Sequence, residues 1–153
     1  MIEQRLTELG IELPQAAMPL ASYVPVHVAD GLAFVAGQVP LEEGKPTIVG
    51  RVGSDVSIED AQAAARRCAL QGLAALRVTL GSLDRVSGIA KVDAFVACDA
   101  GFTDQPKVAN GASDVLVEIF GDAGKHARAA VGVTSLPLGV PVEVALVARL
   151  APA

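Results

Sequence analysis

Residues 57–81, SIEDAQAAARRCALQGLAALRVTLG, give the strongest helix signal in the sequence and anchor the prediction of its fold. Ser57 can serve as the N-cap with Asp60 at the third helical position, which is a capping-box arrangement, and Gly81 is placed to end the helix. Between them, small and apolar residues recur at helical spacing. They are Ala61, Ala65, Cys68, Gly72, Leu76 and Leu80. Because small residues let a helix lie close to a sheet, this segment predicts a helix packed on strands.

Two further helices are predicted. One starts near Thr103, tolerates Pro106 in its first turn and ends at Gly121. Its apolar residues recur at helical spacing. They are Val108, Ala112, Val115, Leu116 and Ile119. The other is a short amphipathic helix at residues 2–9, within an N-terminal extension that covers residues 1–20.

The strands are predicted from β-rich runs between turn signals. Asp30-Gly31 separates runs at 24–28 and 32–36, which is a strong hairpin pattern. Further strands are predicted at 86–96, 127–133 and 140–150. The order β-β-α-β-α-β-β predicts an α+β fold, with two helices packed on one face of a mixed sheet. No internal repeat or linker divides the chain, so residues 1–153 are expected to form a single domain.

Composition limits the class of protein. Apolar residues make up 52% of the 153 residues and charged residues only 19%, which excludes a disordered or low-complexity chain. This apolar share is high for a soluble monomer of this size, and we expect the surplus to be buried against other copies of the chain. The alternative is a bias toward Ala and Val, which raises the apolar count without adding large side chains.

The balance of charge disfavours nucleic acid as a partner. The chain carries 12 basic and 17 acidic residues, a net charge of −5, and lacks the clustered Lys and Arg that phosphate contacts need. Arg66 and Arg67 form the one adjacent basic pair. Together with Arg77 they lie on the face of the first predicted long helix that is opposite its small residues, and we expect that face to be solvated.

No membrane segment is expected from the sequence. Glu3 interrupts the start of the chain, where a signal peptide would need an apolar run. The longest uncharged stretch, residues 13–29, contains Pro14, Pro19 and Pro25, so it cannot span a bilayer as a helix. A cytoplasmic location is the resulting expectation.

No sequence pattern indicates a metal site. Cys68 and Cys98 form no CxxC pair and lie among apolar residues, so buried free thiols are expected. His27 and His126 are far apart and lack Cys or acidic neighbours at ligand spacing. A glycine-rich phosphate loop and a GxSxG motif are also absent from the sequence.

Charges at positions where the strand pattern predicts burial are the candidates for chemistry. Arg128 opens the apolar strand 127–133, and Glu143 lies in the middle of the last strand. Two interpretations remain open, namely a pair of solvent-facing charges or the lining of a polar cleft. In a cleft, a guanidinium can bind a carboxylate through two hydrogen bonds, and a carboxylate can hold or deprotonate a water. Tyr23, the only tyrosine, and Asn110, on the second long helix, are weaker candidates.

Two segments resemble motifs of the YjgF/RidA family. Residues 34–40, FVAGQVP, are similar to its FVSGQ(I/V)P segment, and residues 128–144, RAAVGVTSLPLGVPVEV, are similar to its RSxVxVxxLPxxxxVEIE ending. The resemblance runs from about Tyr23 to the C-terminus. The N-terminal helix, the longer loop before Ser57 and the run NGASD at 110–114 resemble a longer branch, often labelled endoribonuclease or chorismate-mutase-like.

This resemblance implies a chorismate-mutase-like fold of the bacillus type, assembled as a homotrimeric barrel with three clefts between subunits. Archetypal members hydrolyse 2-imino or 2-enamino acids to 2-keto acids and ammonia, and they require no cofactor. By the resemblance, Arg128 clamps the carboxylate of a small substrate, and Glu143 positions the attacking water. The residues that match positions lining the cleft are Tyr23, Ala36, Gly37, Asn110 and Ala130.

Two departures from the family pattern leave alternatives open. Ala36 stands where the motif has Ser, and Ala130 stands where archetypal members have Cys two residues after the arginine. A missing hydroxyl removes one hydrogen-bonding group from the cleft, which would alter the substrate range or lower the rate. The first alternative is therefore a trimer that binds a small carboxylate without catalysis. A remote alternative is an endoribonuclease, which the acidic net charge opposes.

Overall fold

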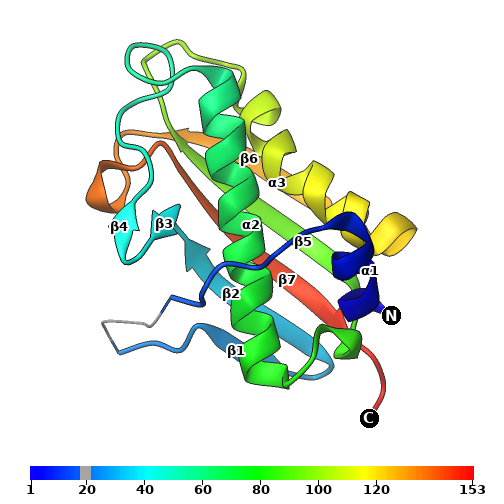
Figure 1. Cartoon of the computed structure of the whole chain (residues 1–153). Helices are drawn as coiled ribbons and strands as arrows, with labels where there is room; N and C mark the ends of the chain where they lie inside the picture. Colours follow the sequence, from blue (N-terminus) through cyan, green and yellow to red (C-terminus); the bar gives the residue numbers. More distant parts are fainter. Residues whose placement is uncertain (18–21) are drawn as a thin grey trace.

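The computed structural model describes residues 1–17 and 22–153, and a five-stranded mixed sheet forms its centre (Figure 1). In spatial order the strands are β1 (Val26–Ala29), β2 (Leu32–Gln38), β7 (Val142–Leu150), β5 (Val86–Ala97) and β6 (Ala127–Val133). β5 and β6 run parallel, and the other neighbouring pairs run antiparallel. The predicted order of elements is confirmed, with the addition of a separate two-stranded sheet formed by β3 (Leu41–Glu42) and β4 (Lys45–Pro46).

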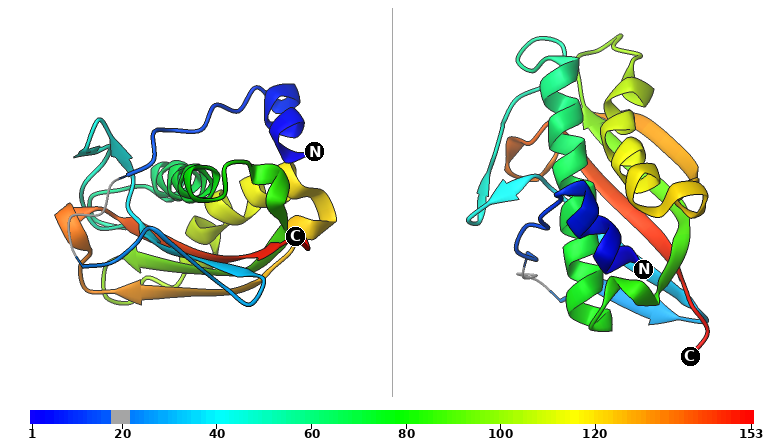
Figure 2. Two further views of the ribbon diagram at one scale, coloured as in Figure 1. Left: turned by 90° about the horizontal axis from the view of Figure 1, so that it is seen from below. Right: turned by 45° about the vertical axis from the view of Figure 1, so that its right-hand side comes forward.

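Two long helices, α2 and α3, cover one face of the five-stranded sheet (Figure 2). The helices are α1 (Ile2–Leu9), α2 (Ile58–Leu80) and α3 (Gln105–Phe120), with short 3-10 helices η1 (Leu83–Arg85), η2 (Gly121–Gly124) and η3 (Pro137–Gly139). The Ser57 hydroxyl accepts a hydrogen bond from the Asp60 amide at 3.1 Å, which confirms the predicted cap. Gly81 ends α2 in the left-handed conformation, at φ 84°. α3 begins two residues after Thr103, with Pro106 in its first turn.

The close packing of α2 depends on glycines. A Cβ at Gly111 in α3 would lie 2.0 Å from the backbone oxygen of Gln62, so no larger residue fits where the two helices meet. Gly72 in α2 faces the sheet, where a Cβ would lie 3.3 Å from Cδ2 of Leu146. These contacts confirm that α2 lies close against the strands, and they hold α3 beside it, over β5 and β6.

The prediction that Arg66, Arg67 and Arg77 lie on a solvated face is only partly correct. All three are partly buried. Arg77 forms an ion pair with Glu3 of α1 at 2.7 Å, and Arg66 forms one with Glu118 of α3 at 3.3 Å. Nε of Arg67 donates to a backbone oxygen of β3. The reason is that α1, α3 and the β3–β4 hairpin supply partners along this face, and the periodicity of α2 carries no signal for them.

The N-terminal extension contains the predicted helix as α1. Leu6 is buried in the core, and the Glu3 carboxylate accepts a hydrogen bond from the Leu83 amide of η1 at 2.9 Å. Residues 18–21, which include Pro19 and the end of the predicted extension, lie outside the described residues. Every helix in the described part of the chain is too short or too polar to cross a membrane.

The second face of the five-stranded sheet, here called the open face, carries no helix in the described residues (Figure 2, left). Phe34 of β2 and Val131 of β6 lie on it and are 44% and 46% exposed. Phe95 and Val147, on the strands between them, are partly exposed as well. The ion pair of Lys91 and Asp93 lies on the same face, between the pair Phe34–Val147 and the pair Phe95–Val131. The open face therefore combines exposed apolar side chains with charged ones.

Candidate functional site

Arg128, in the edge strand β6, lies against α3 and is held there by three hydrogen bonds. Its Nη1 donates to Oδ1 of Asn110 at 2.8 Å and to Oγ of Ser113 at 3.1 Å. Its Nη2 donates to the backbone oxygen of Pro106 at 3.4 Å. Arg128 pairs with Val92, which is fully buried on the helix-covered side, so strand geometry turns Arg128 to that side. The structure thus brings together two of the predicted site residues, Arg128 and Asn110.

These bonds leave one edge of the Arg128 guanidinium available. Asn110 and Ser113 both accept from Nη1, and Pro106 accepts one N–H of Nη2. Within the described residues, Nε and the second N–H of Nη2 have no hydrogen-bond partner. Nε and Nη2 form one of the two-pronged edges through which a guanidinium binds a carboxylate. A ligand carboxylate can therefore accept a hydrogen bond from Nε, and one from Nη2 beside its long contact with the Pro106 oxygen.

Two residues that sequence reasoning missed stand behind Arg128. Oγ of Ser113 lies 2.9 Å from Nε2 of His126, and Nδ1 of His126 lies 2.6 Å from the backbone oxygen of Gly124. Ser113 follows Asn110 by three residues on α3, so the two share a helix face. His126 precedes Arg128 by two residues. The three-residue spacing from Asn110 and the two-residue spacing from Arg128 are the sequence features that could have indicated Ser113 and His126.

Glu143, in β7, lies on the open face against Gly37 of β2. A Cβ at Gly37 would lie 2.7 Å from Oε2 of Glu143 and 3.2 Å from its Cγ, so the glycine leaves the space that the carboxylate occupies. The register of β2 and β7 shifts between Val35 and Gln38, which places Ala36 and Gly37 in an irregular stretch of the strand. Burial raises the pKa of the Glu143 carboxyl above its ordinary value. A higher pKa makes the carboxylate a better proton acceptor.

Arg128 and Glu143 do not meet within one chain. On β5, Arg128 pairs with Val92 and Glu143 pairs with Phe95. Val92 and Phe95 are three residues apart, and successive side chains of a strand point to opposite faces. The two charged groups therefore lie on opposite faces of the sheet, and a site that uses both needs a second copy of the chain.

The chain therefore orders two separate groups of predicted residues. The arginine half-site consists of Arg128, Asn110 and Ala130. The glutamate half-site consists of Glu143, Gly37 and Ala36. Ala130 belongs to the first group because it lies two positions after Arg128 on β6 and therefore shares its side of the strand. Tyr23, before β1, is 54% exposed and forms no hydrogen bond within the described residues, so one chain joins it to neither half-site.

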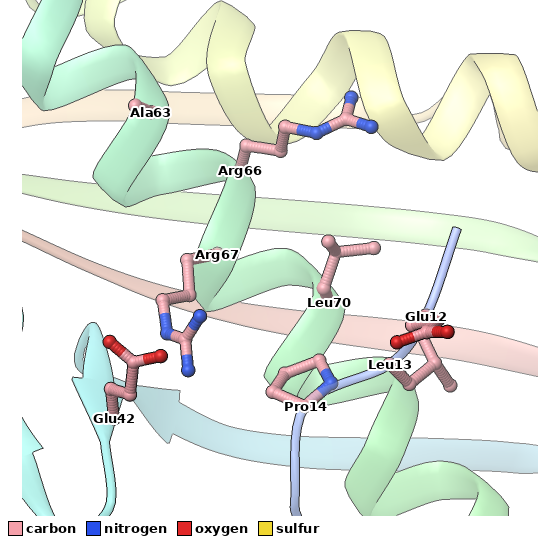
Figure 3. A pocket seen from close by; sticks show the side chains of 8 residues that line it. All are labelled: Glu12, Leu13, Pro14, Glu42, Ala63, Arg66, Arg67 and Leu70. Carbon is pink, nitrogen blue, oxygen red and sulfur yellow. The ribbon is translucent and has the colours of Figure 1, made fainter. Parts of the chain in front are cut away.

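Two hollows in the described surface lie outside both half-sites. One, of about 330 Å³, lies between the N-terminal segment, α2 and β3, where the side chains of Arg67 and Glu42 face each other (Figure 3). The other, of about 340 Å³, lies at one end of the sheet beside Arg51, which donates to backbone oxygens of the segments after β5 and β6. No residue of either half-site lines these hollows.

The cysteines are placed as predicted. Cys68 and Cys98 are both free and buried. Burial, with the nearby Glu143 carboxylate as the second cause, raises the pKa of the Cys68 thiol far above its ordinary value. In residues 1–17 and 22–153, no three His, Cys, Asp or Glu side chains gather into a group that could hold a metal ion.

Known proteins match almost the whole chain. A family model described as "YjgF/chorismate_mutase-like, putative endoribonuclease" matches residues 3–150. Protein TCP17 of Trypanosoma cruzi is 43% identical over 145 residues, which cover 94% of this chain and 90% of that protein. The crystal structure of Atu1372 from Agrobacterium tumefaciens, a protein with unknown function, is 41% identical with a TM-score of 0.87, over 97% of this chain and 91% of that one. A "putative endoribonuclease" from Shewanella oneidensis is 33% identical with a TM-score of 0.92, over 98% and 99% of the two chains. With its α+β fold and both motif segments inside the matched region, this chain belongs to the YjgF/chorismate-mutase-like family.

Proposed function

We propose that the protein hydrolyses 2-imino or 2-enamino acids to 2-keto acids and ammonia, in clefts between the subunits of a homotrimer. The observation that supports this most is the arginine half-site. There the guanidinium of Arg128 is fixed by Asn110, Ser113 and Pro106, and its Nε–Nη2 edge has no full set of partners among the described residues. Substrates of this class carry a carboxylate next to the reacting carbon, and such an edge suits a carboxylate.

The chemistry requires orientation and a water molecule. Arg128 holds the substrate carboxylate and thereby fixes the position of the imine carbon. Glu143 accepts a proton from the water that attacks the imine carbon and passes it to the imine nitrogen, which gives a carbinolamine. The hydroxyl proton of the carbinolamine is then moved to the same nitrogen, again through Glu143, as the C–N bond breaks, so that ammonia leaves and the keto group remains. The raised pKa of Glu143 suits it to both proton transfers.

A second copy of the chain completes the cleft in this proposal. Arg128 and Glu143 lie on opposite faces of one sheet, so one substrate reaches both only where two copies meet. The open face, on which Phe34 and Val131 are exposed, offers apolar surface for that contact. In a cyclic trimer, the arginine half-site of each subunit would face the glutamate half-site of the next.

Carboxylate binding without catalysis is the alternative that the same residues support. Ala36 and Ala130 carry neither a hydroxyl nor a thiol, so two polar groups that the family resemblance implies are missing from the cleft. Ribonuclease activity, which the descriptions of the family and of one relative name, has weaker support. The net charge is −5, and the sequence lacks the clustered basic residues that RNA phosphates require.

Release of 2-keto acids from imino acids, generated in place by an amino-acid oxidase, tests the proposal. We expect the wild-type protein to accelerate release beyond spontaneous hydrolysis, and Arg128→Ala to abolish the acceleration. Arg85→Ala, at an exposed arginine of η1 outside both half-sites, is the matched control and should behave like wild type. A wild-type protein that binds 2-keto acids but accelerates no release would favour the carboxylate-binding alternative.

A further inference from the structure

We infer that Ser113 and His126 are positioning residues for the carboxylate site, and that together they set which edge of the Arg128 guanidinium faces the ligand. This inference rests on the proposed role of Arg128 as the carboxylate clamp. It goes beyond that role by naming the residues that orient the clamp without touching the ligand. The observations behind it are the hydrogen bonds that run from Arg128 through Ser113 and His126 to the backbone of Gly124.

The direction of these hydrogen bonds follows from the two end groups, the Gly124 carbonyl, which can only accept, and the Arg128 guanidinium, which can only donate. The Gly124 carbonyl can only accept, so Nδ1 of His126, 2.6 Å away, carries the hydrogen. In the neutral imidazole, Nε2 is then an acceptor, and the Ser113 hydroxyl donates to it at 2.9 Å. With its hydrogen committed to His126, Ser113 turns its lone pairs toward Nη1 of Arg128, which donates at 3.1 Å. With a neutral imidazole, each of these contacts therefore has one donor and one acceptor.

The far end of the series is fixed to the same helix as Ser113. A Cβ at Gly124 would lie 2.4 Å from the backbone oxygen of Leu116, so this glycine is packed directly on α3. Gly124 itself is buried. Since His126 is bonded to Gly124 and Ser113 lies on α3, the imidazole and the hydroxyl are held in one rigid frame. The frame keeps the hydroxyl in place for Arg128.

Two acceptors at Nη1 fix the plane of the guanidinium, whereas one acceptor would not. Asn110 Oδ1 and Ser113 Oγ lie 2.8 and 3.1 Å from Nη1, which has two N–H groups. The third contact, from Nη2 to the Pro106 backbone oxygen, is long at 3.4 Å. Loss of the Ser113 acceptor would let the guanidinium rotate about its bond to Asn110. The Nε–Nη2 edge would then face the ligand for a smaller fraction of the time, and the affinity for a carboxylate would fall.

Calorimetric titration of the full-length protein with pyruvate, used as the 2-keto-acid probe, tests this inference with two pairs of variants. Ser113→Ala removes the acceptor, and Ser113→Thr keeps it. His126→Asn can retain the bond to Gly124 but offers Ser113 no acceptor, and His126→Gln can place its amide oxygen near the position of Nε2. Melting temperature and size-exclusion chromatography establish that each variant is folded and assembled like wild type.

We expect Ser113→Ala and His126→Asn to raise the Kd for pyruvate about 3- to 10-fold, the loss typical of one hydrogen bond. Ser113→Thr and His126→Gln should remain within about twofold of wild type. In the imino-acid assay, the change should fall on KM rather than on kcat, because the clamp acts on substrate and transition state alike.

Equal affinity for pyruvate in all four variants would overturn the positioning role while leaving the Arg128 clamp intact. A wild-type protein whose pyruvate binding is no better than that of Arg128→Ala would overturn the clamp, and the positioning role with it. If Ser113→Ala does not fold, the His126→Asn and His126→Gln pair decides, since both replacements lie outside α3.

Discussion

Arg128 and Glu143 lie on opposite faces of the same five-stranded sheet, and each is ordered by its own neighbours. Arg128 is bonded to Asn110 and Ser113 beneath α3, whereas Glu143 packs against Gly37 on the open face. Each half-site is therefore built within a single chain before the two could meet at an interface. Variants of either half-site should alter binding or chemistry without unfolding the protein.

Arg128→Lys separates the charge of the clamp from its shape. Lysine keeps the positive charge but cannot present two parallel N–H groups to a carboxylate. We expect the Kd for pyruvate to rise about 10- to 100-fold, with the melting temperature within a few degrees of wild type. Lys91→Arg makes the opposite exchange of cationic side chains at a residue of the open face that is paired with Asp93, and it serves as the control. Unchanged affinity in Arg128→Lys would show that the planar edge is not used.

Gly37→Ala should displace the carboxylate of Glu143. The added methyl group would lie 2.7 Å from Oε2, so the end of the Glu143 side chain has to move. Stability should fall little, because that end is flexible, but kcat should fall about 10- to 100-fold as the carboxylate leaves its position. In a Glu143→Ala background, the same glycine change should have little further effect on kcat. Additive losses in this double-mutant cycle would contradict a direct contact between the two residues.

Glu143→Gln should stabilise the protein at neutral pH. Burial raises the pKa of Glu143 in the folded state, so the folded chain holds this proton at a pH where the unfolded chain has released it. Wild-type stability therefore falls, relative to Glu143→Gln, as the pH rises from about 4, the ordinary range of glutamate, through the raised pKa. Melting temperatures of both proteins between about pH 4 and pH 8 provide the measurement. If the melting temperature of Glu143→Gln exceeds that of wild type by less and less as the pH rises, the raised pKa of Glu143 in the folded state is contradicted.

Gln71→Ala should destabilise the fold more than an exposed glutamine change does. Gln71 of α2 is 2% exposed, its Oε1 accepts from the Leu41 amide at 2.9 Å, and its Nε2 donates to the Val39 oxygen at 2.7 Å. Losing it leaves two backbone groups unsatisfied, which costs about 2–4 kcal/mol. Gln62→Ala, on the same helix with one exposed bond to the Lys107 oxygen, should cost about 0–1 kcal/mol. The free energy of unfolding is measured by urea denaturation at matched protein concentration. If both variants lose the same amount of it, the two hydrogen bonds of Gln71 do not stabilise the fold as we expect.

The fold was largely predictable because its signals are local. Ser57 and Gly81 bound α2, Asp30-Gly31 joins β1 to β2, and the small residues of α2 face the sheet. The partners of the α2 arginines were not predictable, because they come from distant segments. Glu3, which pairs with Arg77, is 74 residues away in the chain, and helical periodicity alone cannot specify such a contact.

The candidate site was predictable only in part, for a different reason. The family motifs point to Arg128 and Glu143, but they do not state that the two side chains lie on opposite faces. That relationship depends on the register of both strands with β5. Ser113 and His126 were missed because hydrogen bonds among single polar residues leave no periodic pattern, although Ser113 shares a helix face with Asn110.

The most direct test of the account is complementation between two inactive variants, Arg128→Ala and Glu143→Gln, with keto-acid release as the readout. In a mixed oligomer, some interfaces would combine the intact Arg128 of one chain with the intact Glu143 of the other. We expect each variant alone to be inactive, and co-expressed, mixed oligomers to recover a measurable part of the wild-type rate. Mixed oligomers as inactive as the separate variants, beside an active wild type, would contradict a cleft shared between copies. An inactive wild type would contradict the imine hydrolysis itself.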